Sequence, residues 1–198
     1  MCYVNVVDFD YTIYRGDSTV DFYLFCLKRH PYYIKYVPKQ VQVGIKYFLK
    51  REELINFKRQ FFCFLKDIDN IEQEVAAFWV SHRKKIKKWY GMRDKRLDII
   101  ISASPSFLLA SICKEMQVKY LIATDIDSKT GEFLSPNCKG EEKVRRFRAQ
   151  YGETKIKQFY SDSLSDLPLA RLAEESYLVK KERIIGWETE RLNQINNL

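Results

Sequence analysis

A short apolar run near the start of the chain ends in two aspartates. Residues 3–7 read Tyr-Val-Asn-Val-Val, which is typical of a β-strand, and Asp8, Asp10 and Thr12 follow at every second position. Because residues i and i+2 of an extended segment share a face, the two carboxylates are expected to lie close together. Such a pair suits Mg²⁺ binding, or a nucleophile beside a general acid or base. A strand that runs into an Asp-capped turn is the alternative, and this motif alone leaves both open.

The C-terminal half of the chain alternates between strand and helix patterns. Apolar runs predict strands at 97–101, 120–124, 155–160 and 176–179, with a hairpin arm at 132–134. Helices are predicted at 107–112, 141–151 and 167–173. This alternation predicts an α/β fold with a Rossmann-like, doubly wound and mainly parallel sheet.

Residues 15–90 differ from the rest of the chain. They are rich in aromatic and basic residues, almost free of glycine, and broken by Pro31 and Pro38. Apolar residues recur at helical spacing, as at Val20, Tyr23, Leu24 and Leu27. We therefore expect a helical cap domain at 15–90, inserted after the first strand of a core domain formed by 1–14 plus 91–198.

Composition narrows the class of protein. With 46% hydrophobic and 30% charged residues, the chain has an ordinary globular composition. Five scattered cysteines without a C-x-x-C pair argue against a disulfide framework, and no apolar stretch is long enough to span a bilayer, so a cytoplasmic location is predicted. The net charge of +8 fits small anionic substrates, an anionic membrane surface or nucleic acid. Nucleic acid is not expected, because no ordered motif supports it, and the oligomeric state is left open.

Polar residues gather at the predicted strand ends. Ser102 ends the second strand, Asp162 follows the fourth, and Asp166 lies one helical turn later. The helix before the fourth strand begins Lys139-Gly-Glu-Glu-Lys143. Since ligands of doubly wound sheets bind at the carboxyl ends of the strands, these side chains are expected to converge on one crevice.

This ordered set of motifs resembles the haloacid dehalogenase superfamily, and the helical insertion resembles the cap of its phosphoserine-phosphatase-like branch. The resemblance implies a Mg²⁺-dependent phosphatase that forms an aspartyl-phosphate intermediate. In such an enzyme Asp8 is the nucleophile and Asp10 the general acid and base. Asp8, Asp162 and the Asp10 carbonyl hold the metal, and Asp166 orients the lysine or a metal-bound water.

The resemblance also implies how the phosphoryl group and the rest of the substrate are held. Ser102 hydrogen-bonds the phosphoryl group, with Thr12 and Ala103 assigned to substrate binding. The neutralising lysine is either Lys139 or Lys143, and the pattern Cys-x-Gly-x-x-Lys favours Lys143.

In the cap, Asp17 and Arg59 are the candidates for holding the leaving group, although Asp17 could equally be a helix N-cap. The expected substrate is a small organic phosphate monoester. A phosphoserine-like compound is one candidate, against which Ala-Ser-Pro after Ser102 counts. The alternatives are a lipid phosphate, such as phosphatidylglycerophosphate, cleaved at an anionic membrane surface, and a non-catalytic phosphate-binding module.

Overall fold

A mostly parallel sheet forms the centre of the protein, seen in a computed structural model that describes residues 3–50 and 54–187. Within these residues six strands form one sheet in the order β3-β2-β1-β4-β5-β6. The strands are β1 (Tyr3–Val7), β2 (Asp98–Pro105), β3 (Tyr120–Thr124), β4 (Lys155–Ser161), β5 (Ala173–Lys180) and β6 (Arg183–Gly186). The first five are parallel, and β6 runs antiparallel to β5. The predicted α/β fold is therefore confirmed.

Alternation along the strands divides the core into two clusters, one on each face of the sheet. Val7 of β1 packs in the cluster that contains the buried residues of α6 (Ser106–Glu115) and of the inserted helices. Its neighbour Val6 packs on the opposite face, with Phe147 of α7 (Glu141–Tyr151) and Leu169 of α8 (Leu167–Ala170). Because β1 is covered on both faces, it reads as a nearly continuous apolar run.

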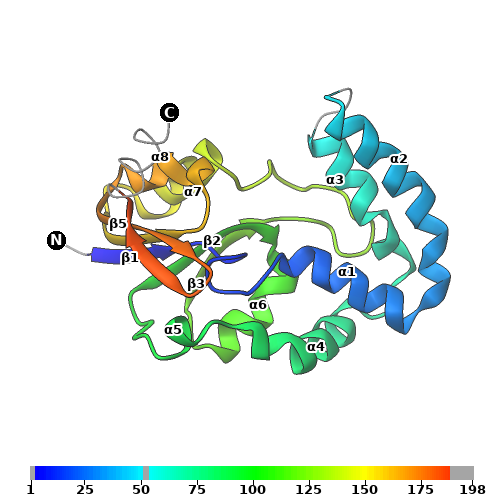
Figure 1. Cartoon of the computed structure of the whole chain (residues 1–198), viewed down its shortest axis with the longest axis horizontal. Helices are drawn as coiled ribbons and strands as arrows, with labels where there is room; N and C mark the ends of the chain where they lie inside the picture. The colour runs from blue at the N-terminus through cyan, green and yellow to red at the C-terminus, as the bar shows by residue number, and fades with distance from the viewer. Residues whose placement is uncertain (1–2, 51–53, 188–198) are drawn as a thin grey trace.

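The chain between β1 and β2 is almost entirely helical. It contains α1 (Ser18–Arg29), η1 (Pro31–Tyr36), α2 (Val37–Phe48), α3 (Leu54–Phe62), η2 (Cys63–Asp67), α4 (Ile71–His82), η3 (Arg83–Lys85) and α5 (Lys88–Gly91). Helices α1 to α4 lie to one side of the sheet, at the right of Figure 1. No helix of the described part of the chain is both long and apolar enough to cross a bilayer.

The outgoing and returning segments of this insertion run together. The amide of Arg15 donates to the Lys85 carbonyl at 2.9 Å, and the amide of Lys87 donates to the Ile13 carbonyl at 2.8 Å. Tyr14 and Ile86 form an isolated β-bridge between them. The two crossings are thus tied to each other beside the carboxyl end of β1.

Several predicted elements need correction. The antiparallel strand β6 was missed, α8 is shorter than predicted, and the expected hairpin arm at 132–134 is reduced to one bridge between Ile126 and Phe133. In α1 the apolar spacing indicated the buried face only in part, because Tyr23 is buried but Val20 and Leu24 are exposed, and Phe22 is buried instead. The cysteines of the described residues are free, and Cys2 lies outside those residues.

Candidate active site

The carboxyl ends of three neighbouring strands bring the predicted polar residues together. Strand β1 lies between β2 and β4. Asp8 and Asp162 come directly after β1 and β4, and Ser102 lies in the C-terminal half of β2, so the three residues are neighbours at one edge of the sheet. They line a cavity of about 250 Å³. Other predicted residues that line it are Asp10, Asp17, Ala103, Lys139, Lys143 and Asp166. Residues far apart in the sequence therefore form one site, as the strand order requires.

A buried lysine bridges two aspartates at the base of this cavity. Nζ of Lys143 lies 2.7 Å from Oδ1 of Asp8 and 2.7 Å from Oδ2 of Asp166. Burial alone would lower the pKa of Lys143, but the charges of the two carboxylates outweigh it and raise that pKa. The lysine therefore stays protonated. The other predicted candidate, Lys139, is exposed at the rim of the cavity.

Asp166 contacts Lys143 and is positioned to orient it. Its Oδ2 accepts from Lys143 and also from the Ser161 hydroxyl at 2.8 Å. This geometry favours the role of orienting the lysine over that of binding a metal. Ser161 was missed by sequence reasoning, because a serine that ends a strand is usually only a turn former.

Asp8 lies in strongly negative surroundings. Burial raises its pKa, and the charges of Asp166 and Asp162 raise it further, whereas Lys143 opposes them. The predicted substrate-binding residue Thr12 is fully buried, and its hydroxyl donates to Asp8 Oδ2 at 3.3 Å and to Asp162 Oδ1 at 3.5 Å. Thr12 does not line the cavity. It holds the carboxylates, so its assignment to substrate binding is not supported.

Asp10 is held by the start of α1 and by β2. Its Oδ1 accepts from the Ser18 amide at 2.8 Å, and its Oδ2 accepts from the Ser104 hydroxyl. Burial raises the pKa of Asp10, and the charge of Asp17 adds to the rise, while both serines oppose it. Ser18 and Ser104 were not identified from the sequence, because only the packing of the insertion on β2 brings them to this carboxylate.

Ser102 and Ala103 form the wall of the cavity on β2. The Ser102 side chain is buried, and its hydroxyl oxygen accepts from the Ser104 amide at 3.1 Å. The Ala103 carbonyl accepts from the Thr124 hydroxyl at 3.0 Å. These contacts lie within the last residues of β2, so the hydroxyl of Ser102 is positioned at the cavity before any ligand arrives.

A smaller cavity of about 160 Å³ continues from Asp10 toward the inserted helices. It is lined by Asp10, Asp17, Thr19, Val20, Phe61, Phe62, Ala103 and Ser104. Asp17 is the N-cap of α1, accepting from the Val20 amide at 2.9 Å, as the alternative reading expected. It nevertheless faces both cavities. One residue thus caps the helix and contributes negative charge beside Asp10.

Arg59 does not reach either cavity. Its side chain is about half exposed, and its Nε lies 3.7 Å from Oε2 of Glu132. The loop of Glu132 packs closely on α3, because a Cβ added at Gly131 would overlap the Phe62 carbonyl oxygen. Arg59 therefore joins the insertion to this loop, and the structure does not place it with the other predicted substrate ligands.

The oxygen atoms of the site suit a hard cation. Four carboxylates, those of Asp8, Asp10, Asp162 and Asp166, face one buried lysine, so the group carries excess negative charge. The part of the chain that the structure describes contains no cluster of three or more His, Cys, Asp or Glu side chains able to hold a metal. The set expected from the sequence differs from such a cluster, because it combines two carboxylates with one backbone carbonyl. Oxygen donors of this kind are those that Mg²⁺ prefers.

The mainly parallel α/β sheet and the aspartates at the ends of its strands together define the class of protein. The chain belongs to the haloacid dehalogenase-like hydrolase family, whose model matches residues 6–171. A histidinol-phosphatase of Neisseria meningitidis serogroup C (strain 8013) is 26% identical over 144 residues. That match spans 67% of this chain and 60% of the length of the relative.

Solved structures show the same fold. A protein of unknown function from Bordetella pertussis Tohama I matches with a TM-score of 0.76 and 18% identity, over 100% of this chain and 96% of the other. A probable phosphoserine phosphatase from Vibrio cholerae matches with a TM-score of 0.64 and 13% identity, over 89% of this chain and 55% of the other. At these identities the likeness concerns the fold.

Proposed function

We propose that the protein is a metal-dependent phosphatase that hydrolyses small organic phosphate monoesters through an aspartyl-phosphate. The observation that carries this proposal is the division of labour between two aspartates. Asp8 is held by Lys143 at the base of the catalytic cavity, whereas Asp10 is held by Ser18 and Ser104 and lines both this cavity and the smaller one. One carboxylate is thus placed for attack and the other for proton transfer to a leaving group.

The proposed reaction has two steps. An Asp8 oxygen attacks phosphorus while Asp10 donates its proton to the departing alkoxide, which leaves as an alcohol. Asp10 then takes a proton from water, whose oxygen attacks the aspartyl-phosphate and releases phosphate. The raised pKa of Asp10 supports its role as an acid, because burial favours the protonated form.

Lys143 and a bound metal address the repulsion between Asp8 and an anionic phosphate. The ammonium of Lys143 neutralises part of that charge, and Ser102 is placed to donate to a phosphoryl oxygen. The carboxylates of Asp8 and Asp162, with the Asp10 carbonyl, would hold Mg²⁺. When bound, Mg²⁺ supplies further positive charge to the transferring group.

The smaller cavity supports a leaving group with an amine and an apolar part. Asp17 offers a negative charge there, while Phe61 and Phe62 offer apolar surface. The likeness to a histidinol-phosphatase supports the same class of substrate. We propose that residues 15–90 act as the cap that shapes this cavity.

A panel of phosphorylated metabolites, with p-nitrophenyl phosphate as reference, tests this function. Hydrolysis should require added Mg²⁺ and stop when the metal is chelated. Amine-bearing phosphates should have higher kcat/KM than amine-free ones of similar size. A protein that bound Mg²⁺ and beryllofluoride but hydrolysed nothing in the panel would instead be a phosphate-binding module.

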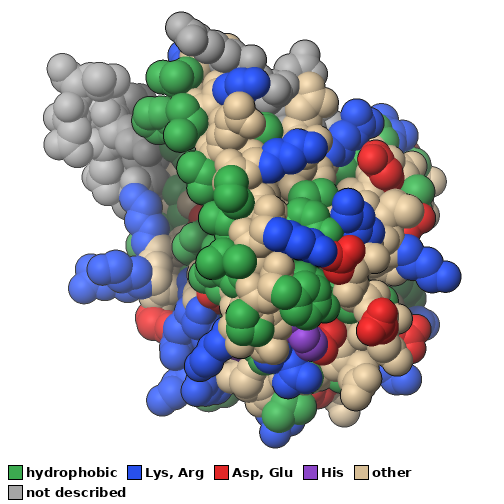
Figure 2. Space-filling view, turned by 90° about the vertical axis from the view of Figure 1, so that its right-hand side faces the viewer, with side chains coloured by type: hydrophobic (Ala, Val, Ile, Leu, Met, Phe, Trp, Pro, Cys, Tyr) green, Lys and Arg blue, Asp and Glu red, His purple; other side chains and the backbone are tan. Residues whose placement is uncertain are grey.

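A lipid phosphate is the second candidate substrate, and the outer face of α2 favours it. Apolar side chains there are unusually exposed: Val41 by 53%, Ile45 by 57% and Phe48 by 86%. Figure 2 shows hydrophobic side chains running along this face with lysines and arginines beside them. Residues 31–50 contain four lysines and neither aspartate nor glutamate. An apolar face on a segment whose own charged residues are all lysines suits anionic lipid, and it disfavours a second copy of itself.

Flotation with vesicles of phosphatidylglycerol and phosphatidylcholine tests the membrane contact. Wild-type protein should float at low salt, and Ile45→Asp/Phe48→Asp should not. The control Val80→Asp/Met92→Asp alters two equally exposed apolar residues outside α2. Equal flotation of all three proteins, or of none, would contradict the lipid candidate and leave a soluble phosphate ester.

A further inference from the structure

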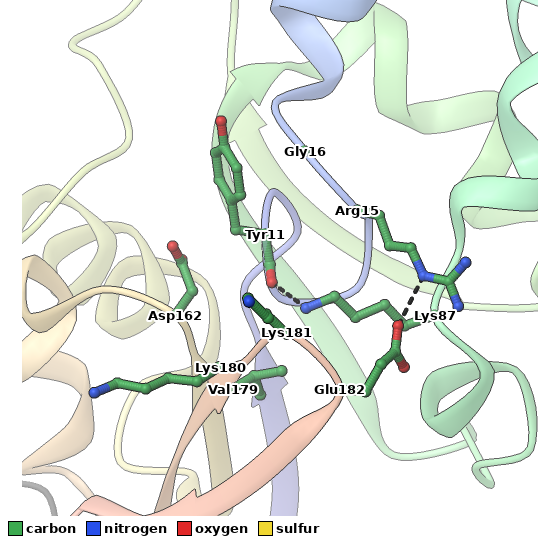
Figure 3. Close-up of a pocket in the computed structure, with 9 residues that line it drawn as sticks. All are labelled: Tyr11, Arg15, Gly16, Lys87, Asp162, Val179, Lys180, Lys181 and Glu182. Atoms are coloured by element: carbon green, nitrogen blue, oxygen red, sulfur yellow. Dashed lines mark hydrogen bonds and ion pairs between the residues drawn. The ribbon is translucent and has the colours of Figure 1, made fainter.

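A larger cavity adjoins the candidate active site. It has a volume of about 630 Å³ and shares Tyr11 and Asp162 with the catalytic cavity. Its walls come from the two crossing segments of the insertion and from the hairpin that joins β5 to β6, as Figure 3 shows. This volume falls within the range of about 300–1,000 Å³ that is usual for small-molecule sites. The proposed phosphatase reaction does not use this space.

The cavity wall carries more positive than negative charge. Arg15, Lys87, Lys180 and Lys181 line it, against two acids, Asp162 and Glu182. The charge of Glu182 is engaged by Arg15, whose Nε lies 2.7 Å from Oε1 of Glu182. Asp162 faces Thr12 and the catalytic cavity. Cationic side chains therefore outnumber acidic ones on the wall that an entering ligand would meet.

Lys87 is the most informative of these lysines because it is buried. Only 3% of its surface is exposed, and its ammonium donates to the Tyr11 carbonyl (Figure 3). Within the described residues it forms no ion pair with a carboxylate. Burial lowers the pKa of Lys87, and the nearby charges of Glu182 and Asp162 offset this only in part, so its charge is incompletely compensated. An anion in the cavity would supply the missing compensation.

We propose that this cavity is a second anion-binding site, which takes the phosphate group of a small phosphorylated molecule. Lys87 provides the buried charge, and Lys180 and Lys181 provide further cations from the hairpin. Lysine suits this role, because it binds phosphate as a compact point charge. The phosphate is either free orthophosphate or a second phosphate group of an organic molecule. Lys87 also contacts the Tyr11 carbonyl, in the segment that directly follows Asp10. A bound anion would therefore change the interactions of that segment.

Calorimetric titration with orthophosphate tests the site without requiring turnover. Wild-type protein with Mg²⁺ should bind two phosphates per chain, one in each cavity. Lys180→Gln/Lys181→Gln should weaken one of these sites at least about tenfold, since each lost charged contact is worth that much. The control Lys84→Gln/Lys88→Gln removes two exposed lysines outside the cavity and should leave both sites intact.

The outcomes separate this inference from the proposed function. A single site that persists in the hairpin variant belongs to the catalytic cavity and overturns the inference. A single site that is lost in the hairpin variant supports the inference and counts against phosphate binding at Asp8. Two sites that are unchanged in every variant, or no binding at all, also overturn it. Lys87→Met should weaken the same site, because it removes the buried charge. If that variant does not fold, the result for the exposed lysines Lys180 and Lys181 still decides the test.

A kinetic comparison distinguishes the two sources of phosphate, and this arm rests on the proposed function. If the cavity holds a second phosphate of the substrate, the hairpin variant should lower kcat/KM for a bisphosphorylated ester but not for p-nitrophenyl phosphate. If it takes free orthophosphate, both substrates should keep their kcat/KM while the calorimetric site is lost.

Discussion

Nζ of Lys143 lies 2.7 Å from Oδ1 of Asp8, although 135 residues separate them in the chain. Both side chains are buried, so this ion pair forms in a medium where charges interact far more strongly than in water. Buried ion pairs are costly to assemble and are weak evidence for stability by themselves. Its position at the base of the cavity instead indicates a functional reason for the pair.

Replacing the proposed nucleophile should abolish turnover. We expect Asp8→Asn to reduce kcat for p-nitrophenyl phosphate by about 10³-fold or more, because no other described carboxylate occupies its position. Release of p-nitrophenolate in the presence of Mg²⁺ measures this, and circular dichroism checks that the variant is folded. Activity within tenfold of wild type would refute Asp8 as the nucleophile.

Replacing Lys143 should destabilise the protein far more than replacing Lys139. Lys143→Met leaves the buried carboxylates of Asp8 and Asp166 without their cation, so we expect a loss of about 3–5 kcal/mol in the free energy of unfolding as well as of activity. The exposed Lys139, replaced in the same way, should change stability by less than about 0.5 kcal/mol. Urea denaturation measures both. Similar losses in the two variants would contradict the assignment.

Asp17 permits its two roles to be separated. Asp17→Asn keeps an N-cap acceptor for the Val20 amide but removes the charge beside the smaller cavity. We expect unchanged stability and a decrease of about tenfold in kcat/KM for amine-bearing phosphates relative to amine-free ones. Asp17→Ala should in addition lose about 1 kcal/mol of stability. An unchanged substrate ratio in Asp17→Asn would leave only the capping role.

Glu142 should stabilise the start of α7 in a pH-dependent way. Its contacts with Arg145 and Arg146 lower its pKa from 4.5 to about 2. A carboxylate with a lowered folded-state pKa stabilises above its unfolded pKa, and this contribution is lost as the pH falls from 4.5 toward 2. Glu142→Gln should cost about 1 kcal/mol at pH 7 and progressively less below pH 4. Urea denaturation of wild type and variant at pH 7 and at a pH below 4 measures the stability difference between them. The same difference at both pH values would contradict the ion pairs.

Local sequence was sufficient for the regular elements of the core. The β-branched run before Asp8 is a strand, the helix predicted at 141–151 is α7, and the strand predicted at 120–124 is β3. These segments have strong periodicity and clear boundaries. The short strand β6 carries no such pattern, because it forms by pairing with β5 at the edge of the sheet.

The sequence by itself determined the order of the five parallel strands along the chain and the family motifs at their ends. It favoured Lys143 over Lys139 only through a family pattern, because both lie near the start of one helix and the packing of that helix is what turns Lys143 inward. It expected Thr12 and Arg59 at the substrate, whereas the structure does not place them among the residues that line either cavity, and it missed Ser18 and Ser104, which hold Asp10. Hydrogen bonds and buried charges depend on which segments meet in space, and that was decided only by the tertiary structure.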